Sequence, residues 1–403
     1  MGNAVVAWKQ RLFEELARGS DLLCLEILGR QFTVRWGRAV NRQQRESMSS
    51  AWARCASSRE PVLPPPPMEP TDNLPFTATV IGRSLKHDGG MFHVRAASFA
   101  ELAENLTSRL TVEAILANAG GLTMLHACGV AHPATGAVVA LVAKSGTGKT
   151  TAASVLAKTY GYVTDETVAI RPDGSVVPYP KPLSVKQGPG APKRQVGPGE
   201  LGLQPAPAVP FIQSIVLLNR VQSDHLATPV LERVPLADAV LALIPDSSSQ
   251  GDIREPLQSL CRLIDSVGGV WQVTYSEAAD LPVALDPLFR TQLQNQSGAR
   301  PEWEARAAGG TRPGPIPDSY IRRAPAKDAV AIGDDLLVML DNQIVRLSGI
   351  GPAIWAVSAS ALRPDQLAEA VGEVHGTPEG YRDAVALAMQ QLIAASVLEQ
   401  GGE

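Results

Sequence analysis

Residues 137–151, AVVALVAKSGTGKTT, contain the side chains of this chain best suited to chemistry. An apolar, strand-like run breaks into a Gly-rich turn that ends in Gly-Lys-Thr-Thr and leads into a helix-forming stretch. Gly146 and Gly148 let successive backbone N–H groups turn inward around an anion without a Cβ in the way. Lys149 would reach the β- and γ-phosphates of a nucleotide, and the Thr150 hydroxyl would ligate Mg²⁺. The pattern therefore predicts a phosphate-binding loop for ATP and Mg²⁺.

The elements on both sides must position this loop. We expect a strand that ends near Ala143 and a helix over about 150–160, whose positive end faces the same anion. The usual loop pattern has a glycine where this chain has Ala143, and an alanine fits there if it keeps a β conformation. The alternative is a Gly-rich turn that binds nothing. The expected nucleotide contacts are Lys144, Ser145, Gly146, Thr147, Gly148, Lys149, Thr150 and Thr151.

Paired carboxylates follow the predicted helix. Asp165 and Glu166 end a short strand-like piece, so both would lie at a strand end close to the loop. One carboxylate can accept the proton of an attacking hydroxyl while the other helps to hold Mg²⁺. A solvated acidic turn is the alternative. Upstream, His126 lies in an apolar stretch, where a lone histidine is more often a core residue than a catalyst.

Taken in order, the histidine, the loop and the acidic pair resemble HPr kinase/phosphorylase and its smaller kinase relatives. The resemblance implies an α/β (α+β) P-loop kinase core of the HPr-kinase type. Glu166 stands where that family has a second aspartate, and residues 178–183 stand where its long glycine-containing signature would be. Carried over by position, the family roles fall on Asp165 as general base, His126 and Lys149 as further catalytic groups, and Thr150 and Glu166 as Mg²⁺ ligands.

The last part of the chain has a different pattern. From residue 328, three short strand-like runs are separated by turns at Gly333-Asp334 and Asp341-Asn342, and a helix starts near Ile350. Pro364 and the residues before Tyr381 mark two more helix starts. Three strands followed by three helices are the layout of a small winged helix-turn-helix domain.

The stretch 343–355, QIVRLSGIGPAIW, resembles PqqD. The resemblance implies a domain that recognises the leader of a ribosomally made, modified peptide by pairing it with the exposed edge of the third strand, against the last helix. DNA binding and a dimerisation wing are the alternatives, and the acid-rich segment without a Lys/Arg stripe disfavours DNA. The expected peptide contacts are Gln343, Ile344, Val345, Arg346, Tyr381 and Val385.

Composition sets the remaining bounds. The chain has 403 residues, of which 45% are hydrophobic and 19% charged, as expected for two or three folded domains. A net charge of −4 suggests no nucleic-acid partner. No apolar run approaches the ~20 residues of a membrane span, and no signal segment is evident, so we expect no membrane partner and a cytoplasmic protein. The scattered cysteines indicate neither a zinc site nor a disulfide framework.

Linkers divide the chain into five expected parts. Prolines at 64–67 favour a stiff linker, and the Gly/Pro-rich stretch near 300 favours a flexible one. A further mobile segment, 187–199, is expected to close over the acceptor with Lys193 or Arg194 near phosphate, or else to be a surface insertion. The parts are an N-terminal α/β region (1–59), a linker (60–75), the HPr-kinase-like domain (76–292), a flexible linker (293–326) and the PqqD-like domain (327–403).

Together the two resemblances imply an ATP-dependent kinase that phosphorylates a Ser or Thr hydroxyl of a precursor peptide. Two alternatives stay open: a nucleotide-gated, non-catalytic escort of the precursor peptide, and a kinase of a small molecule or carrier protein. The expected partners are the leader and core of the precursor peptide, with other maturation enzymes and a homo-oligomer left open.

Overall fold

The computed structural model describes residues 21–82, 90–144, 146–222, 228–290, 301–309, 314–341 and 343–402. The first twenty residues of the predicted N-terminal region, and Asn342 of the second predicted turn, lie outside these residues. The chain forms two compact units. The first comprises Met1–Glu232, Asp246–Ser249 and Trp271–Gln292, and the second Arg233–Pro245, Gln250–Val270 and Leu293–Glu403.

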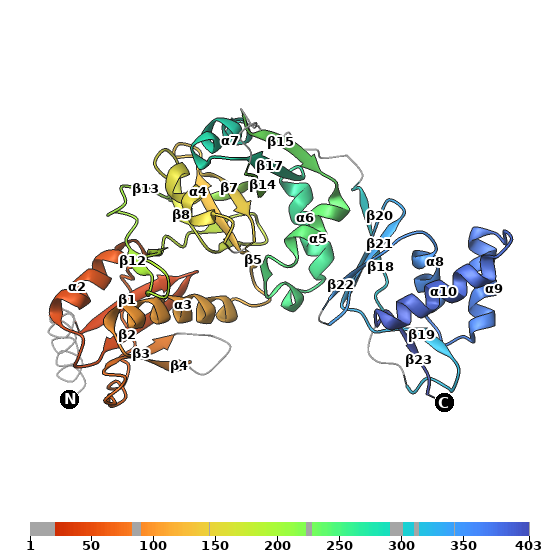
Figure 1. Cartoon of the computed structure of the whole chain (residues 1–403), viewed down its shortest axis with the longest axis horizontal. Coiled ribbons are helices and arrows are strands. Elements are labelled where there is room, and N and C mark those ends of the chain that lie inside the picture. The colour runs from red at the N-terminus through yellow and green to blue at the C-terminus, as the bar shows by residue number, and fades with distance from the viewer. Residues whose placement is uncertain are drawn as a thin grey trace, which may run out of the picture. The chain divides into compact units, whose positions relative to one another are not determined.

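The first unit begins with a four-stranded antiparallel sheet in the order β1-β2-β3-β4. Helix α3 packs on this sheet (Figure 1) through leucines that recur every four residues, and Ser98 caps its first turn by accepting from the backbone N–H of Glu101. The elements are β1 (Leu22–Ile27), β2 (Arg30–Trp36), α2 (Arg42–Ala51), the 3-10 helix η1 (Ala53–Cys55), β3 (Phe76–Gly82), β4 (Met91–Ala96) and α3 (Phe99–Ala117).

The Pro-rich segment 60–75 is part of the connection that leads from β2 to β3 within this sheet, and it does not separate domains. Strand β3 begins directly after it and pairs with β2, so the boundary we expected at residue 76 is corrected: β3 and β4 belong to the N-terminal sheet. Prolines lack an N–H but keep their carbonyl oxygens. Side chains of β2 satisfy carbonyls here, because Arg35 donates to Pro64 O and Gln31 donates to Glu60 O.

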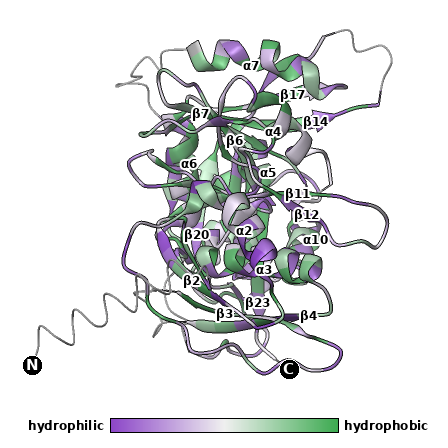
Figure 2. Cartoon of the chain, turned by 90° about the vertical axis from the view of Figure 1, so that its left-hand side faces the viewer, coloured by the Kyte–Doolittle hydropathy of each residue, from purple (hydrophilic) through white to green (hydrophobic). Residues whose placement is uncertain are grey.

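The centre of the first unit is a seven-stranded mixed sheet in the order β13-β8-β6-β7-β14-β17-β15. Strand β7 is buried along its whole length and pairs with antiparallel β6 and parallel β14, which explains its continuous apolar sequence. Figure 2 shows β6 and β7 in the hydrophobic colours. The strands are β6 (Ala127–Ala131), β7 (Ala137–Val142), β8 (Gly161–Thr164), β13 (Gln204–Pro205), β14 (Phe211–Arg220), β15 (Val230–Val234) and β17 (Val270–Tyr275).

Helices α4 and α7 share an apolar core with this sheet, in which Leu156 and Leu285 are buried with Val139 and Leu141. A second small sheet, in the order β10-β9-β5-β16, and the hairpin β11–β12 complete the unit. These elements are β5 (Thr123–Leu125), α4 (Lys149–Leu156), β9 (Val168–Ile170), β10 (Val176–Val177), β11 (Leu183–Val185), β12 (Arg194–Val196), β16 (Ser247–Ser248), the 3-10 helix η3 (Ala278–Asp280) and α7 (Leu281–Arg290).

The second unit contains the three strands and three helices that we expected near the C-terminus. Strands β20, β21 and β22 form an antiparallel meander, and α8, α9 and α10 follow it. The helices begin at Gly351, Pro364 and Tyr381, close to the predicted starts. Their bounds are β20 (Asp328–Ile332), β21 (Asp335–Met339), β22 (Ile344–Leu347), α8 (Gly351–Val357), α9 (Pro364–His375) and α10 (Tyr381–Ala394).

Two further strands occupy the range 293–326, where we expected a flexible linker. Strand β18 (Trp303–Arg306) pairs with β20, and β19 (Ile321–Arg323) pairs with β23 (Leu398–Gln400). Pairing satisfies their backbone groups, so these residues are part of the second unit. The unit also contains α5 (Leu236–Leu243), the 3-10 helix η2 (Gln250–Asp252) and α6 (Pro256–Ser266).

Asp328 links β20 to α6 within the second unit. Its buried carboxylate accepts from the backbone N–H groups of Leu257 and Gln258, both at 2.9 Å, and from the Gln258 side chain at 2.8 Å. The residue before the helix, Glu255, supplies no side-chain cap. Asp328 therefore serves as the cap of α6 from a distant strand. Among the described residues, no helix is long and apolar enough to cross a membrane.

Candidate functional site

The predicted phosphate loop connects β7 to α4. Gly146 (φ +86°) and Gly148 (φ +98°) both have positive φ, and a Cβ at either position would meet no atom within 4 Å. Glycine is therefore required here by the backbone and not by lack of space. Ala143 has no positive φ, as we expected for a residue that extends the strand. Ser145 lies outside the described residues.

Helix α4 presents its N-terminus to this loop. Gly148 is its N-cap, and no side chain caps its first turn. Its leading N–H groups therefore remain suited to an anion. Thr147 donates from its hydroxyl to Lys144 O at 2.6 Å, which closes the turn, and Thr151 is exposed on the helix.

Lys149 lies in the first turn of α4 and folds back over the loop. Its ammonium donates to the Ala143 carbonyl oxygen. Burial lowers the pKa of Lys149, and the charges of Asp246, Glu166 and Asp165 counteract part of that effect. The lysine thus lies within electrostatic reach of three carboxylates.

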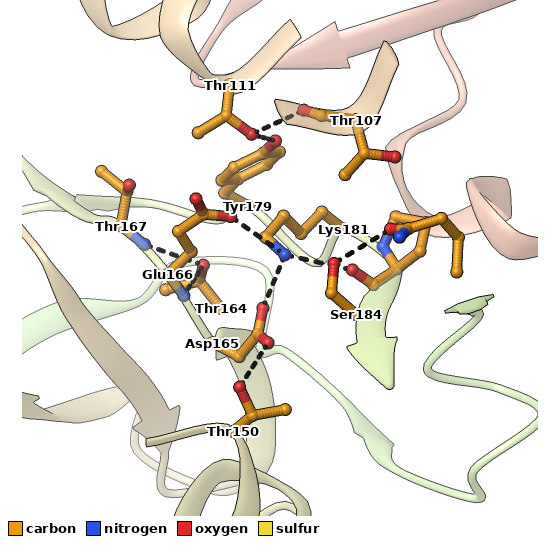
Figure 3. Close-up of polar contacts among 12 residues, drawn as sticks. Thr107, Thr111, Thr150, Thr164, Asp165, Glu166, Thr167, Tyr179, Lys181 and Ser184 are labelled. Atoms are coloured by element: carbon orange, nitrogen blue, oxygen red, sulfur yellow. Dashed lines mark hydrogen bonds and ion pairs between the residues drawn. The ribbon is translucent and has the colours of Figure 1, made fainter. Parts of the chain in front are cut away.

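Strand β8 delivers the acidic pair to the same place. Thr150 Oγ1 donates to Asp165 Oδ2 at 3.3 Å, and the buried Tyr162 hydroxyl donates to Asp165 Oδ1 at 3.0 Å. Burial, then the charge of Asp165, raises the pKa of Tyr162, so this hydroxyl stays a donor. The structure therefore joins the predicted loop and the predicted carboxylates through a direct contact (Figure 3).

Lys181 contacts both carboxylates, and the sequence did not indicate this. Its ammonium lies 3.0 Å from Asp165 Oδ1 and 3.0 Å from Glu166 Oε2 (Figure 3), and its side chain is 2% exposed. Burial disfavours its charge, but the two carboxylates outweigh burial and raise the pKa of Lys181. A lysine between two prolines in an apolar stretch was the only available signal.

His126 and Asp246 meet where β5 pairs with β16. The His126 N–H donates to the Asp246 backbone carbonyl at 2.6 Å. Burial, followed by the positive charge of Lys149, lowers the pKa of His126, although Glu166 and Asp246 counteract part of this effect. The charge of Lys149 thus acts on His126, and the catalytic role of His126 stays a prediction. Asp246 was missed because the pairing that places it joins segments more than a hundred residues apart.

These residues fit a nucleotide that carries its own Mg²⁺. The described residues contain no group of three or more His, Cys, Asp or Glu side chains that could hold a metal ion. Mg²⁺ commonly binds through one or two protein ligands together with substrate phosphates and water. The Thr150 hydroxyl and the half-buried Glu166 are suitable ligands beside the uncapped end of α4.

Lys193 and Arg194, which we expected near phosphate, lie at the start of β12. Lys193 forms an ion pair with Glu104 and Arg194 with Glu200, so both cations have protein partners. Strand β22 is the last strand of its sheet, as leader binding by strand addition requires.

The peptide contacts predicted in the second unit also vary. Ile344, Val345 and Tyr381 are half-buried, and Gln343 donates to Ala395 O at 2.7 Å. The exposed Arg346 forms ion pairs with Asp335 and Asp238. Val385 is 2% exposed in the core, so its predicted peptide contact is corrected: its side chain stabilises α10.

Comparisons with known proteins add little to this geometry. No family model matches the chain, and no curated protein matches it. Among solved structures, the HPr(Ser) kinase/phosphatase from Coxiella burnetii aligns with 41% of this chain and 93% of its own, at 14% identity and a TM-score of 0.21.

Proposed function

We propose that the chain is an ATP-dependent kinase that phosphorylates a Ser or Thr hydroxyl of a ribosomally synthesised peptide. The observation that carries the proposal is the contact between Thr150 in the loop-helix junction and Asp165 after β8. Phosphoryl transfer depends mainly on positioning and on neutralising charge. A phosphate loop joined directly to a carboxylate supplies both.

Each residue would have a distinct task in this reaction. MgATP would supply the phosphoryl group, and its Mg²⁺ would offset the negative charge of the phosphates. The N–H groups at the start of α4 would bind phosphate, Lys149 would neutralise its charge, and His126 would serve as a neutral donor near it. Thr150 and Glu166 would hold the Mg²⁺ that accompanies ATP, and Asp165, whose Oδ2 lies 3.3 Å from the Thr150 hydroxyl, would accept the proton of the attacking hydroxyl.

The peptide acceptor is proposed from the second unit. Its three strands and three helices follow the order expected of a PqqD-like domain, and β22 lies at the edge of its sheet. An edge strand offers backbone N–H and C=O groups to an extended leader. Ile344 and Val345 on this strand and Tyr381 at the start of α10 would contact the leader.

A leader-dependence assay tests this proposal. The full chain is incubated with Mg²⁺, ATP and the precursor peptide encoded beside its gene, with and without the leader, and the mass of the peptide is measured. We expect a gain of one phosphate that requires the leader. Binding of ATP and leader without a phosphopeptide would instead establish the escort, and transfer that ignores the leader would point to another acceptor.

Asp165→Asn tests the proton acceptor. We expect turnover to fall by about 10²–10⁴-fold while ATP binding persists, since the amide cannot accept the proton. Asp173→Asn is the matched control, because Asp173 is an exposed aspartate in the same unit whose contacts are with Ser175. Wild-type turnover in Asp165→Asn would remove Asp165 from the base role.

A further inference from the structure

Lys181 is delivered to the site by residues 178–183, PYPKPL. Pro180 and Pro182 fix φ on both sides of the lysine. Tyr179 anchors the segment, since its N–H donates to Val163 O on β8 at 3.0 Å and its hydroxyl is 2.7 Å from Thr111 on α3. The segment is thereby fixed beside the strand that ends in the acidic pair.

All three N–H groups of the ammonium have partners. Besides the carboxylates of Asp165 and Glu166 at 3.0 Å, the ammonium donates to Pro182 O at 3.1 Å. The side chain is also 2% exposed. Lys181 therefore has no donor left for a phosphate, and a direct contact with the nucleotide does not explain its presence.

The contacts of Lys181 divide the oxygens of the acidic pair into two sets. The ammonium takes Oδ1 of Asp165, which Tyr162 also contacts, and leaves Oδ2 toward Thr150. It takes Oε2 of Glu166, and among the described residues none donates to Oε1. Lys181 thus fixes one oxygen of each carboxylate, and Oδ2 of Asp165 remains directed to Thr150.

Stability alone is a weak reason for such a contact. A buried ion pair often contributes no more than well-packed apolar residues of the same volume, because desolvation offsets the attraction. Arg322 forms an ion pair with one carboxylate, that of Glu399, whereas Lys181 contacts the two carboxylates of the acidic pair.

We propose that Lys181 is a positioning residue, which holds one oxygen of Asp165 and one of Glu166 and so keeps Oδ2 of Asp165 directed to Thr150 at the start of α4. The inference rests on the proposed kinase function and deepens it. Without the ammonium, two adjacent carboxylates repel each other and can rotate. Asp165 would then be misplaced for the proton, and Glu166 for the metal.

Lys181→Met tests this role with three measurements on the full chain: ATP affinity by calorimetry with Mg²⁺ and with EDTA, the kcat and KM for release of ADP from MgATP, and the unfolding midpoint. We expect affinity in EDTA to stay within about twofold, because the α4 contacts persist. The gain in affinity brought by Mg²⁺ should be lost, and kcat should fall on the order of 10²-fold, the usual effect of a misplacement of about 1 Å.

Asn118→Ala is the matched control. It removes the buried hydrogen bonds to Leu28 O and Ala114 O in the same unit, and Asn118 makes no hydrogen bond to the acidic pair or to residues 178–183. We expect a lower unfolding midpoint with wild-type kcat and wild-type Mg²⁺ dependence. If Lys181→Met behaves like this control, with lower stability but an unchanged kcat per folded molecule, the positioning role is overturned.

Lys181→Arg carries the test if Lys181→Met does not fold. Arginine keeps the charge, but its planar donors cannot reproduce three separate contacts made from one nitrogen atom. We expect a folded protein with reduced kcat and a reduced effect of Mg²⁺, and wild-type values would overturn the inference. A wild-type chain that binds no ATP would refute the proposed function and the inference together, whereas an active wild type beside an equally active variant refutes the inference alone.

Discussion

Gly148→Ala separates the backbone requirement of the phosphate loop from ordinary helix stability. Gly148 is the N-cap of α4 at φ +98° and ψ 19°, and an added Cβ would meet no atom within 4 Å. The free-energy cost of Gly148→Ala therefore comes from the backbone conformation and not from a steric clash. An L-residue in the left-handed region costs roughly 1–2 kcal/mol of conformational free energy. This corresponds to about a 5- to 30-fold decrease in the equilibrium constant for forming the start of the helix.

The effect on ATP should exceed this loss. Alanine can relieve its strain by rotating φ to a negative value, and that rotation turns the peptide groups next to Gly148 away from a bound phosphate. Loss of one hydrogen bond to a charged group costs about 1.5–3 kcal/mol. We therefore expect ATP affinity to fall by roughly 10- to 150-fold, measured by calorimetry.

Gly380→Ala is the matched control, because Gly380 is the N-cap of α10 at φ +78° and ψ 4°, without a side-chain cap and with no atom within 4 Å of an added Cβ. Hydrogen exchange should show a similar loss of protection in the helix that follows each substitution, α4 or α10. ATP affinity should fall only for Gly148→Ala. Unchanged ATP affinity in Gly148→Ala, or an equal fall in Gly380→Ala, would refute the reasoning.

Two further predictions concern other parts of the chain. Asp328→Ala should destabilise the second unit by about 3 kcal/mol in urea unfolding, because it leaves buried N–H groups of Leu257 and Gln258 without an acceptor, and an unchanged midpoint would contradict the capping role. His126 should titrate by NMR with a pKa below 6.5, the ordinary value for histidine, because burial and the charge of Lys149 lower its pKa. The free energy of unfolding should then decrease as the pH drops through 6.5 toward the folded pKa. A titration midpoint of His126 above 6.5 would contradict this prediction.

Local signals explain what the sequence predicted well. A buried strand, two glycines and a helix start are encoded within fifteen residues, so β7, the loop and α4 could be placed in advance. Pro364 at a helix start and the turn at Gly333 similarly fixed α9 and the hairpin β20–β21. Each of these features depends on the backbone preferences of its own residues.

Tertiary pairing explains what the sequence did not predict. No local signal shows that β3 pairs with β2 although a Pro-rich segment lies between them in the sequence, so that segment was interpreted as a linker. Helix α10 has one apolar stripe, and Val385 could not face both the core of its own unit and a peptide. Asp246 and Lys181 lack any motif, since their roles arise from the partners that the fold brings to them.

The charges at the site lead to one further conclusion about the proposed reaction. Lys149 and Lys181 face three carboxylates, Asp165, Glu166 and Asp246, while the lowered pKa of His126 keeps it neutral near pH 7. The side chains alone are thus a poor receptor for a polyphosphate, because Lys181 is already committed to the acidic pair. Attraction must come from the uncapped start of α4 and from a cation that accompanies the nucleotide. In the proposed reaction, the carboxylates that would weaken binding of free ATP are the same groups that would hold its Mg²⁺ and take the proton, so the proposal predicts that MgATP binds more tightly than the bare anion.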